Sequence, residues 1–347
     1  MIKIEKDKLL DCAKEILQAV GESAENAKIV AETLILADAR GISTHGTYLL
    51  TPIISRVKAA QLSLPTKTSI ITEDGAVAVV DGGNGLGAVA GKLAADLAIK
   101  RASQFGISIV LIRNTNSLGA LANYTEMVAR QGMVGLMGCN AAPAMAPWGG
   151  AEAFLGTNPF AVAIFTGKEM LFSADMASSI VARGKIRKAA REGKSIPSDW
   201  ALDENGNLTT DPVAALKGVL LPMAGPKGSA IAIVVDILSG ILAGSKYATD
   251  LKSFHALEGP TGVGASLIAV NIRKFMNLEE FTHNINQYFL KIKSMKKAGF
   301  ASELYLPGEI EYQKELESKK SGIPLDEKAV NALNEMLEKF GLSRSLG

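Results

Sequence analysis

The chain has 347 residues, of which 48% are hydrophobic and 21% charged, a composition typical of a globular protein with a buried core. Its 37 Lys and Arg residues nearly balance 35 Asp and Glu residues, so the net charge of +2 predicts neither a nucleic-acid partner nor a strongly basic one. Two cysteines exclude a disulfide scaffold, and without a signal peptide or a membrane-length apolar run we expect a soluble cytoplasmic protein.

Helical periodicity opens the chain, over residues 5–21 and again over 23–40, where Ser23 is the expected N-cap. GISTHG follows as a loop. From residue 68 strands alternate with helices, which indicates an α/β layer. Two strands with a turn between them are expected within 68–81, further strands at 107–114, 133–141, 160–165, 170–174 and 265–271, and helices at 88–104, 120–132 and 230–243. The tail returns to helix from about residue 279, so we expect the two termini to pack as one unit.

The stretch VAVVDGGNGLGAVAGKLAADLAIK, residues 77–100, runs from a β-branched strand through Gly-x-Gly into a helix. Gly85 and Gly87 would let the backbone approach a pyrophosphate, as in a Rossmann dinucleotide fold. That motif also expects an acidic residue at the end of the next strand, whereas this strand ends in Arg113 and Asn114. An arginine there would suit a 2′-phosphate instead. These residues alone leave both a cofactor turn and a purely structural turn open.

Other segments are specific in combination. GTNP (156–159) is followed by DMAS (175–178), by IPSDWALDENGNLTTDP (196–212), and by further matches at ADARGISTHG (37–46), APWGGAEAFLG (146–156), GPKG (225–228), VDILSGILAG (235–244) and LPGE (306–309). This ordered set, from about residue 10 to 320, resembles the malate/L-lactate dehydrogenase-like oxidoreductase family. That family lacks the classical lactate dehydrogenase fold. It includes enzymes similar to ureidoglycolate dehydrogenase, diketogulonate reductase, sulfolactate dehydrogenase and cyclic ketimine-carboxylate reductase.

The resemblance implies a mixed α/β, non-Rossmann nicotinamide-binding fold, with a mixed β-sheet and a helical domain formed by both termini. It also implies a homodimer, and it makes the glycine turn mainly architectural. We therefore expect residues 1–67 with 275–347 to form the helical domain. Residues 68–274 are expected to form the α/β region that binds cofactor and substrate, and a division of that region into two subdomains near 120–230 stays open.

Hydride transfer also needs a proton donor or acceptor at the reacting oxygen or nitrogen. Histidine suits this task because its ordinary pKa of about 6.5 lies near neutral pH. Of the three histidines, His255 and His283 are expected as surface or helix-packing residues. His45 lies in the STHG loop, and it falls on the family's Ser-His-Gly position, which implies substrate contact and a role as the acid.

Three positions depart from the family pattern. Ser117, in NTNSLG, stands where a second histidine is usual, and a hydroxyl can donate or relay a proton but cannot be a buffered base. Leu49 replaces an arginine suited to a substrate carboxylate, and Ala141 replaces Ser or Thr after the strand that ends in CN. Ser117 and Asn140 remain as polar candidates for substrate contact. We predict a more apolar substrate pocket than in a 2-hydroxy-acid dehydrogenase, unless another cation such as Arg113 pairs with a carboxylate.

The resemblance also indicates which residues would hold the cofactor, NAD or NADP. They are Asp175, Met176, Ala177, Lys227, Gly228, Gly308, Glu309 and Ile310. Lys227 at a helix start makes a sensible anion site, with a solvated loop lysine as the alternative. Asp175 is a second candidate proton relay, although its carboxylate could instead cap the next helix. NAD is favoured, whereas basic residues at 185–191 would favour a 2′-phosphate; no metal is predicted.

The sequence thus predicts an NAD(P)-dependent oxidoreductase that moves hydride between nicotinamide and a small 2-hydroxy or 2-oxo compound, with a substrate atypical for the family. His45 is the expected proton donor or acceptor, Ser117 a polar substrate contact, and Asp175 and Lys227 cofactor residues. Reduction of a cyclic imine is one alternative. The other is a nicotinamide-binding paralogue with little catalysis. Beyond a small-molecule substrate and a second copy of the chain, no nucleic-acid or membrane partner is predicted.

Overall fold

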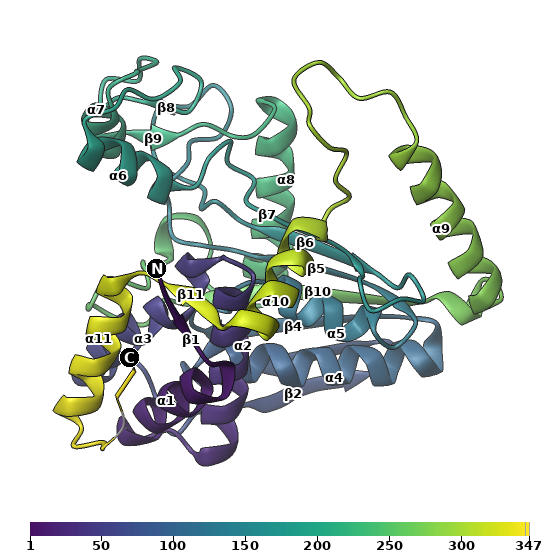
Figure 1. The fold of residues 1–347 in the computed structure, drawn as a ribbon, viewed down its shortest axis with the longest axis horizontal. Helices are drawn as coiled ribbons and strands as arrows, with labels where there is room; N and C mark the ends of the chain where they lie inside the picture. The colour runs from purple at the N-terminus through teal and green to yellow at the C-terminus, as the bar shows by residue number, and fades with distance from the viewer. Residues whose placement is uncertain (344, 347) are drawn as a thin grey trace.

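The computed structural model describes residues 1–343, 345 and 346 (Figure 1). The helices are α1 (Lys6–Ala19), α2 (Ala24–Ala39), α3 (Leu50–Lys58), α4 (Gly87–Phe105), α5 (Ala122–Ala129), α6 (Arg183–Glu192), α7 (Pro212–Lys217), α8 (Pro226–Asp236), α9 (Leu278–Lys293), α10 (Glu309–Ser321) and α11 (Glu327–Lys339). The strands are β1 (Ile2–Ile4), β2 (Ser69–Asp74), β3 (Val77–Asp81), β4 (Ile107–Thr115), β5 (Met133–Cys139), β6 (Phe160–Ile164), β7 (Phe172–Met176), β8 (Ala201–Leu202), β9 (Val219–Leu220), β10 (Val263–Asn271) and β11 (Ile323–Leu325).

The predicted mixed α/β fold is confirmed. Within the described residues, one sheet holds seven strands in the order β2-β3-β4-β10-β5-β6-β7. Strands β3 and β4, which α4 connects, run parallel. The other neighbouring strands of this sheet pair antiparallel. Among the described residues, β3, α4 and β4 therefore form the one β-α-β crossover of this sheet, and its other strand pairs are antiparallel.

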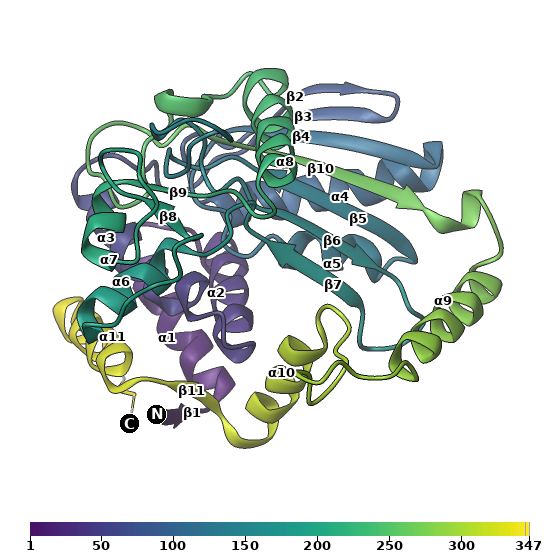
Figure 2. The ribbon, with the colours of Figure 1, turned by 90° about the horizontal axis from the view of Figure 1, so that it is seen from above.

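Helices cover both faces of this sheet (Figure 2). Helix α4 places Ala90, Ala94, Ala98 and Ala102 four residues apart, and all four are buried in the sheet's core. Strand β5 shows the two faces directly, because a side chain at Gly135 would meet α5 and one at Gly138 would meet Val235 of α8. Glycine at both positions therefore lets helices approach the sheet closely from opposite sides.

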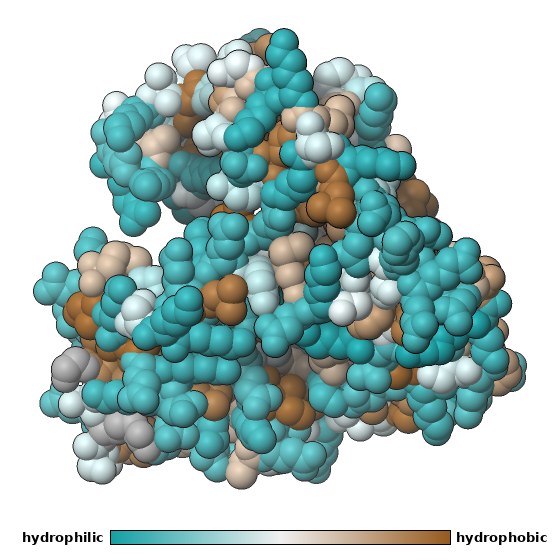
Figure 3. Space-filling model, turned by 45° about the vertical axis from the view of Figure 1, so that its right-hand side comes forward, coloured by the Kyte–Doolittle hydropathy of each residue, from teal (hydrophilic) through white to brown (hydrophobic). Residues whose placement is uncertain are grey.

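The two ends of the chain share a second core. Strand β1 pairs antiparallel with β11, so segments near the two ends of the chain lie side by side (Figure 1). Buried leucines from α1, α2, α3 and α11 belong to one cluster, which includes Leu17, Leu34, Leu50 and Leu333. A third cluster fills a smaller unit between residues 145 and 232, which contains α6, α7 and the β8–β9 pair. On the face drawn in Figure 3 a deep indentation separates this upper unit from the body below.

Helix α9 stands apart from the terminal core and lies beside the β6–β7 turn (Figure 2). Asn286 donates to the carbonyl of Thr166 at 2.8 Å, and the ring of Phe289 stacks on Phe172 with 6.0 Å between centroids. In the part of the chain that is described, no helix combines the length and the apolar character that crossing a membrane requires.

Candidate active site

The segment from Arg40 to Leu49 leaves α2 and enters α3 through two 3-10 turns, η1 (Ser43–His45) and η2 (Thr47–Leu49). Its first residues line a cavity of about 230 Å³, and its last residue lines a much smaller pocket of about 20 Å³. His45 lies on the stretch that runs from one to the other. One short segment of the chain, residues 40–49, therefore borders both cavities.

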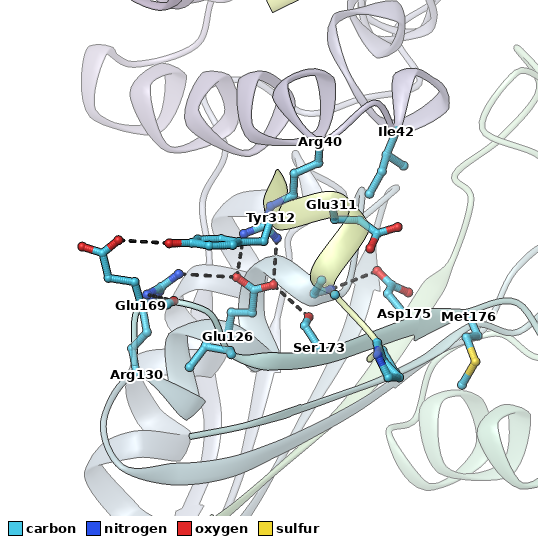
Figure 4. A pocket seen from close by; sticks show the side chains of 15 residues that line it. Arg40, Ile42, Glu126, Arg130, Glu169, Ser173, Asp175, Met176, Glu311 and Tyr312 are labelled. Carbon is cyan, nitrogen blue, oxygen red and sulfur yellow. Dashed lines mark hydrogen bonds and ion pairs between the residues drawn. The ribbon is translucent and has the colours of Figure 1, made fainter. Parts of the chain in front are cut away.

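The larger cavity lies between β7, α5, α10 and the end of α2 (Figure 4). Three of the residues predicted to hold the cofactor, Asp175, Met176 and Gly308, line it together with Ile42 and Glu311. Gly308 permits this closeness, because a Cβ on it would lie 3.1 Å from the backbone oxygen of Ser173. Two stretches that are far apart in sequence, near 175 and near 308, thus form one wall.

A buried ion-pair network forms the floor of this cavity (Figure 4). Arg40 donates from Nη1 and Nη2 to the two carboxylate oxygens of Glu126, at 2.7 and 2.8 Å. Its Nε donates to Glu315 of α10 at 3.0 Å, and the Ser173 hydroxyl donates to Glu126 at 2.8 Å. The network ties α2, α5, β7 and α10 together, and it holds the walls of the cavity in fixed positions.

Asp175 lies on β7 and opens onto the cavity. Its carboxylate accepts a hydrogen bond of 2.9 Å from the backbone N–H of Ala122, at the start of α5. Removal from water raises the pKa of Asp175 and the charge of Glu126 adds to this, while the backbone donors at Ala122 and Leu121 oppose it. The carboxylate does cap a helix, but the helix is α5, which precedes Asp175 in the chain, and not the one that follows.

His45 is half-buried at the end of η1. Its Nδ1 lies 3.0 Å from the hydroxyl of Thr44, and burial lowers the pKa of its imidazole. Burial thus favours the neutral form of the ring, the form that can accept a proton. His255 and His283 are exposed, and the ring of His255 lies 6.2 Å from that of Tyr48.

The smaller pocket is lined by two of the residues that depart from the family pattern. Leu49 and Ser117 both line it, beside Leu34, Ile53 and Phe254. Its lining, drawn from the described residues, contains no charged side chain. The Ser117 hydroxyl accepts only a long hydrogen bond of 3.4 Å from the N–H of Gly119, which leaves its proton for another partner.

The glycine turn lies under this pocket. Gly85 and Gly87 are buried, and a Cβ on Gly87 would lie 2.3 Å from the carbonyl oxygen of Ser117. A Cβ on Gly85 would lie 2.4 Å from the side chain of Thr66, whose hydroxyl accepts from the N–H of Leu86 at the start of α4. The start of this helix is thus packed against protein.

Two polar candidates for substrate contact, Asn140 and Arg113, are hydrogen-bonded to other groups of the protein. Asn140 is 1% exposed, and its amide donates to Asp236 and to the carbonyl of Lys246 while accepting from Gly264. Arg113 donates from Nε to Asp81 at 3.0 Å. Both side chains hold the fold together at these atoms.

The remaining predicted cofactor residues do not line the cavity. Lys227 is exposed in the first turn of α8, and Gly228 is needed there because a Cβ would lie 2.2 Å from the carbonyl of Met223. Glu309 pairs with Lys293 at 2.5 Å and accepts from the N–H of Leu306, so it fixes the loop that carries Gly308. Ala177 and Ile310 each follow a residue near the wall, and Ile310 is exposed.

Several residues around the larger cavity were not predicted from the sequence, namely Arg40, Glu126, Ser173, Glu311 and Tyr312. Arg40 stands inside ADARGISTHG, five residues before His45, so its motif was the available signal. Tyr312 donates to Glu169 at 3.0 Å across the mouth of the cavity, an arrangement that depends on tertiary contact alone (Figure 4).

Comparison with known proteins assigns the class. The sequence model of the malate/L-lactate dehydrogenase family matches residues 4–334, so the chain belongs to this family, as its motifs predicted. The chain is 39% identical over 330 residues to the L-sulfolactate dehydrogenase of Methanocaldococcus jannaschii, across 95% of this chain and 94% of that protein. A solved structure of sulfolactate dehydrogenase from the same organism superposes with a TM-score of 0.92 at 37% identity, covering 98% of both chains.

Two further relatives differ in chemistry. The chain is 32% identical over 325 residues to the ureidoglycolate dehydrogenase (NAD(+)) of Escherichia coli K12, across 93% of each protein. The structure of delta1-piperideine-2-carboxylate reductase from Pseudomonas syringae superposes with a TM-score of 0.87 at 26% identity, covering 97% of this chain and all of that one. The chain is therefore an oxidoreductase of a dehydrogenase family that acts on CH–OH groups.

Proposed function

We propose that this protein transfers a hydride between a nicotinamide cofactor and a small 2-hydroxy or 2-oxo compound, with a substrate less polar than is usual in the family. The observation that carries the proposal is the segment from Arg40 to Leu49, which borders both the larger cavity and the apolar pocket. His45 lines neither cavity itself, but it lies in the sequence between Ile42, which lines the larger one, and Leu49, which lines the smaller one, and this supports a role between cofactor and substrate. We propose further that this is a non-Rossmann site and that the terminal helices α1, α2, α3 and α11 form a domain of their own. Helix α9 lies within 275–347 but packs beside β6 and β7, so it is not part of that domain.

The larger cavity fits part of a dinucleotide. Asp175 and Glu311 offer carboxylate oxygens to ribose hydroxyls, and Gly308 lets a ligand approach the backbone. The same carboxylates would repel a 2′-phosphate, which favours NAD over NADP. The buried contacts of Gly85 and Gly87 argue against pyrophosphate binding at the glycine turn. Lys227, Gly228, Ala177, Glu309 and Ile310 stay proposed as outer contacts of the cofactor.

When bound, nicotinamide supplies or accepts the hydride; the protein's task is to hold the substrate and move the proton. In the reductive direction His45, as imidazolium, donates a proton to the substrate oxygen or nitrogen; in the oxidative direction the neutral ring accepts it. Ser117 donates a hydrogen bond to the same substrate. Asp175 lines the larger cavity while its carboxylate accepts from the N–H of Ala122, and we keep it as a second candidate proton relay.

A cyclic imine is the second candidate substrate. The similarity to delta1-piperideine-2-carboxylate reductase favours it, because the apolar side chains of Leu49, Leu34 and Phe254 suit the carbon atoms of a ring. The pocket of about 20 Å³ has room for only the edge of such a ring, so the rest would lie outside it. A carboxylate pointed at this lining would lack a partner, at substantial cost in binding. We therefore rank 2-oxo acids with an apolar side group and cyclic imines above dicarboxylates.

The test combines cofactor binding with a substrate panel. Titration with NADH and NADPH by fluorescence should show tighter binding of NADH, and 2-oxo acids, cyclic imines and neutral ketones should then be screened for turnover. On the substrate that turns over, His45→Ala should lower kcat by roughly 10²- to 10⁴-fold. The exposed His283→Ala serves as the matched control and should keep wild-type activity. Full activity of His45→Ala would remove the mechanism, and tight cofactor binding without any turnover would favour a non-catalytic nicotinamide-binding protein.

We also propose that the protein acts as a homodimer. Ile233, Val234, Ile237 and Ile241 of α8 and the π-helical turn after it are all at least 40% exposed, and they form an apolar stripe at helical spacing. Burial against a second copy would remove this surface from water. Light scattering after size exclusion should give the mass of a dimer, and Val234→Glu should shift it towards the monomer if this stripe is the interface.

A further inference from the structure

Asp38 lies in the last turn of α2, directly beneath the segment that carries His45. Its side chain is buried, with 4% exposed. Oδ2 accepts two hydrogen bonds from Thr47, one of 2.8 Å from the backbone N–H and one of 2.7 Å from the hydroxyl. Asp38 therefore binds the first residue of η2 by both its backbone and its side chain.

The second carboxylate oxygen touches the residue after His45. A Cβ on Gly46 would lie 1.8 Å from Oδ1 of Asp38, which is far too short for two atoms that are not bonded to each other. Gly46 has an extended backbone with φ of −89°, so glycine is required here for the close approach and not for an unusual conformation. The carboxylate and the backbone at residues 46–47 thus fit each other with no room for a side chain.

The turn that Asp38 holds is the one that borders both cavities. Ile42 lines the larger cavity and Leu49 the apolar pocket, and His45 lies between them in the chain. A 3-10 turn has weaker hydrogen bonds than an α-helix, so two consecutive turns of three residues need outside support to keep one conformation. Thr47, between His45 and Leu49, is the point at which Asp38 supplies it.

We propose that Asp38 is a positioning residue for the proposed reaction: by accepting two hydrogen bonds from Thr47 and packing closely against Gly46 it fixes the orientation of His45 between cofactor and substrate. This inference rests on the proposed function, because it assumes that His45 exchanges the proton. Asp38 lines neither of the two cavities. Its effect on rate passes entirely through the imidazole.

A double-mutant cycle tests this dependence. Asp38→Ala should lower kcat by about 10- to 100-fold while the dissociation constant of NADH, measured by fluorescence, changes less than two-fold. In the His45→Ala background the same replacement should have almost no further effect, because the group that it positions is gone. If Asp38→Ala lowers kcat equally in both backgrounds, the positioning role is wrong while His45 keeps its own. If His45→Ala retains full activity, the proposed function itself fails.

Thr47 provides a milder version that should fold normally. Thr47→Val keeps the backbone donor and the size of the side chain but removes the hydroxyl, whereas Thr47→Ser keeps the hydroxyl. We expect Thr47→Val to lower kcat several-fold, with KM for NADH unchanged, and Thr47→Ser to restore most of the loss. Wild-type kcat in Thr47→Val, or failure of Thr47→Ser to recover activity, would overturn the proposal. Thermal unfolding of each variant shows that the folded protein is being compared.

Discussion

Arg40 and Glu126 form a two-point ion pair inside the protein, with the two nitrogens of the guanidinium 2.7 and 2.8 Å from the two carboxylate oxygens. Both side chains are less than a tenth exposed. The pair joins the end of α2 to α5, and Ser173 and Glu315 complete its hydrogen bonds. The turn with His45 begins at the same end of α2, so this pair connects the helix before the candidate active site to the sheet.

Arg40→Met should lower the free energy of unfolding by about 2–4 kcal/mol, because Glu126 would stay buried with only the Ser173 hydroxyl and the longer 3.7 Å contact to the half-exposed Arg130. Urea denaturation followed by circular dichroism measures the loss. The matched control is Asp96→Asn, which breaks the exposed Lys92–Asp96 pair on α4 and should cost less than about 1 kcal/mol. Equal losses in the two variants would contradict a structural role for the buried pair.

Local patterns predicted the elements that depend on local spacing. The periodicity over 5–21 and 23–40 corresponds to α1 and α2, and Ser23 accepts from the N–H of Asn26 as an N-cap should. The expected strand pair within 68–81 is the β2–β3 hairpin. By contrast, β1 and β11 pair across more than 300 residues and were not predicted, because a three-residue strand has no period of its own.

Gly87 allows a test of the packed glycine turn. In Gly87→Ala the new Cβ would lie 2.3 Å from the carbonyl of Ser117 and 2.6 Å from that of Asn116, and backbone atoms cannot move aside cheaply. We expect a loss of about 2–3 kcal/mol in unfolding free energy and a lower kcat/KM, because the backbone at Ser117 must shift.

The control for Gly87 is Gly184 on α6. A Cβ there would meet nothing within 4 Å, so Gly184→Ala should stabilise the protein by up to about 1 kcal/mol through helix propensity. Both variants are compared by urea denaturation and by kcat/KM on the same substrate. A Gly87→Ala protein as stable and active as Gly184→Ala would mean that the turn has room to spare, and a cofactor at this turn would have to be considered again.

Arg56 holds the loop that covers the apolar pocket. It is 0% exposed and donates to the carbonyls of Gln61, Ala256 and Gly259, while the ring of Phe254 lies 5.7 Å from its guanidinium carbon. Arg56→Lys should cost about 1–3 kcal/mol in stability, because one ammonium group cannot reach three separated carbonyls. We expect KM for the substrate to rise as well, since Phe254 lines the pocket.

Lys58, two residues after Arg56 at the end of α3, is the control for Arg56. It is exposed, and the pKa of its ammonium is lowered because it faces Lys339. Lys58→Ala removes this contact between like charges, so the midpoint of urea unfolding should stay the same or rise slightly. If Arg56→Lys behaves like Lys58→Ala in stability and KM, the loop does not depend on Arg56.

Motifs identified some of the candidate site and missed the rest for a physical reason. Asp175, Met176 and Gly308 belong to quoted motifs, and the structure brings them to one cavity. Arg40 and Glu126 are far apart in sequence, and ordinary charged residues give no sign of which partner they will meet. Asn140 stays a predicted substrate contact, but nothing in the sequence indicated that its amide would be hydrogen-bonded to buried groups that only the tertiary fold places around it.

Asp38 predicts a distinct dependence of stability on pH. Burial raises its pKa from 3.8 to about 6, although the donors at Thr47 oppose this. In the unfolded chain the group releases its proton near pH 4, whereas in the folded protein it keeps the proton until about pH 6. The folded state therefore binds more protons in this window, and the free energy of unfolding should fall by about 2 kcal/mol as pH rises from 4 to 6, and by about 3 kcal/mol in all between pH 3 and pH 7.

Asp38→Asn removes this titration, so the difference in unfolding free energy between wild type and variant isolates it. Urea denaturation at intervals from pH 4 to pH 8 should show a difference that declines up to about pH 7 and is constant above it. Asp175 and Asp236, whose pKa values are also raised chiefly by burial, contribute equally to both proteins and cancel. Asp96→Asn, an exposed aspartate replaced in the same way, should give a flat difference across the range. A flat difference for Asp38→Asn as well would show that this carboxyl releases its proton as easily in the folded protein as in the unfolded chain, and that solvent reaches the space beneath His45.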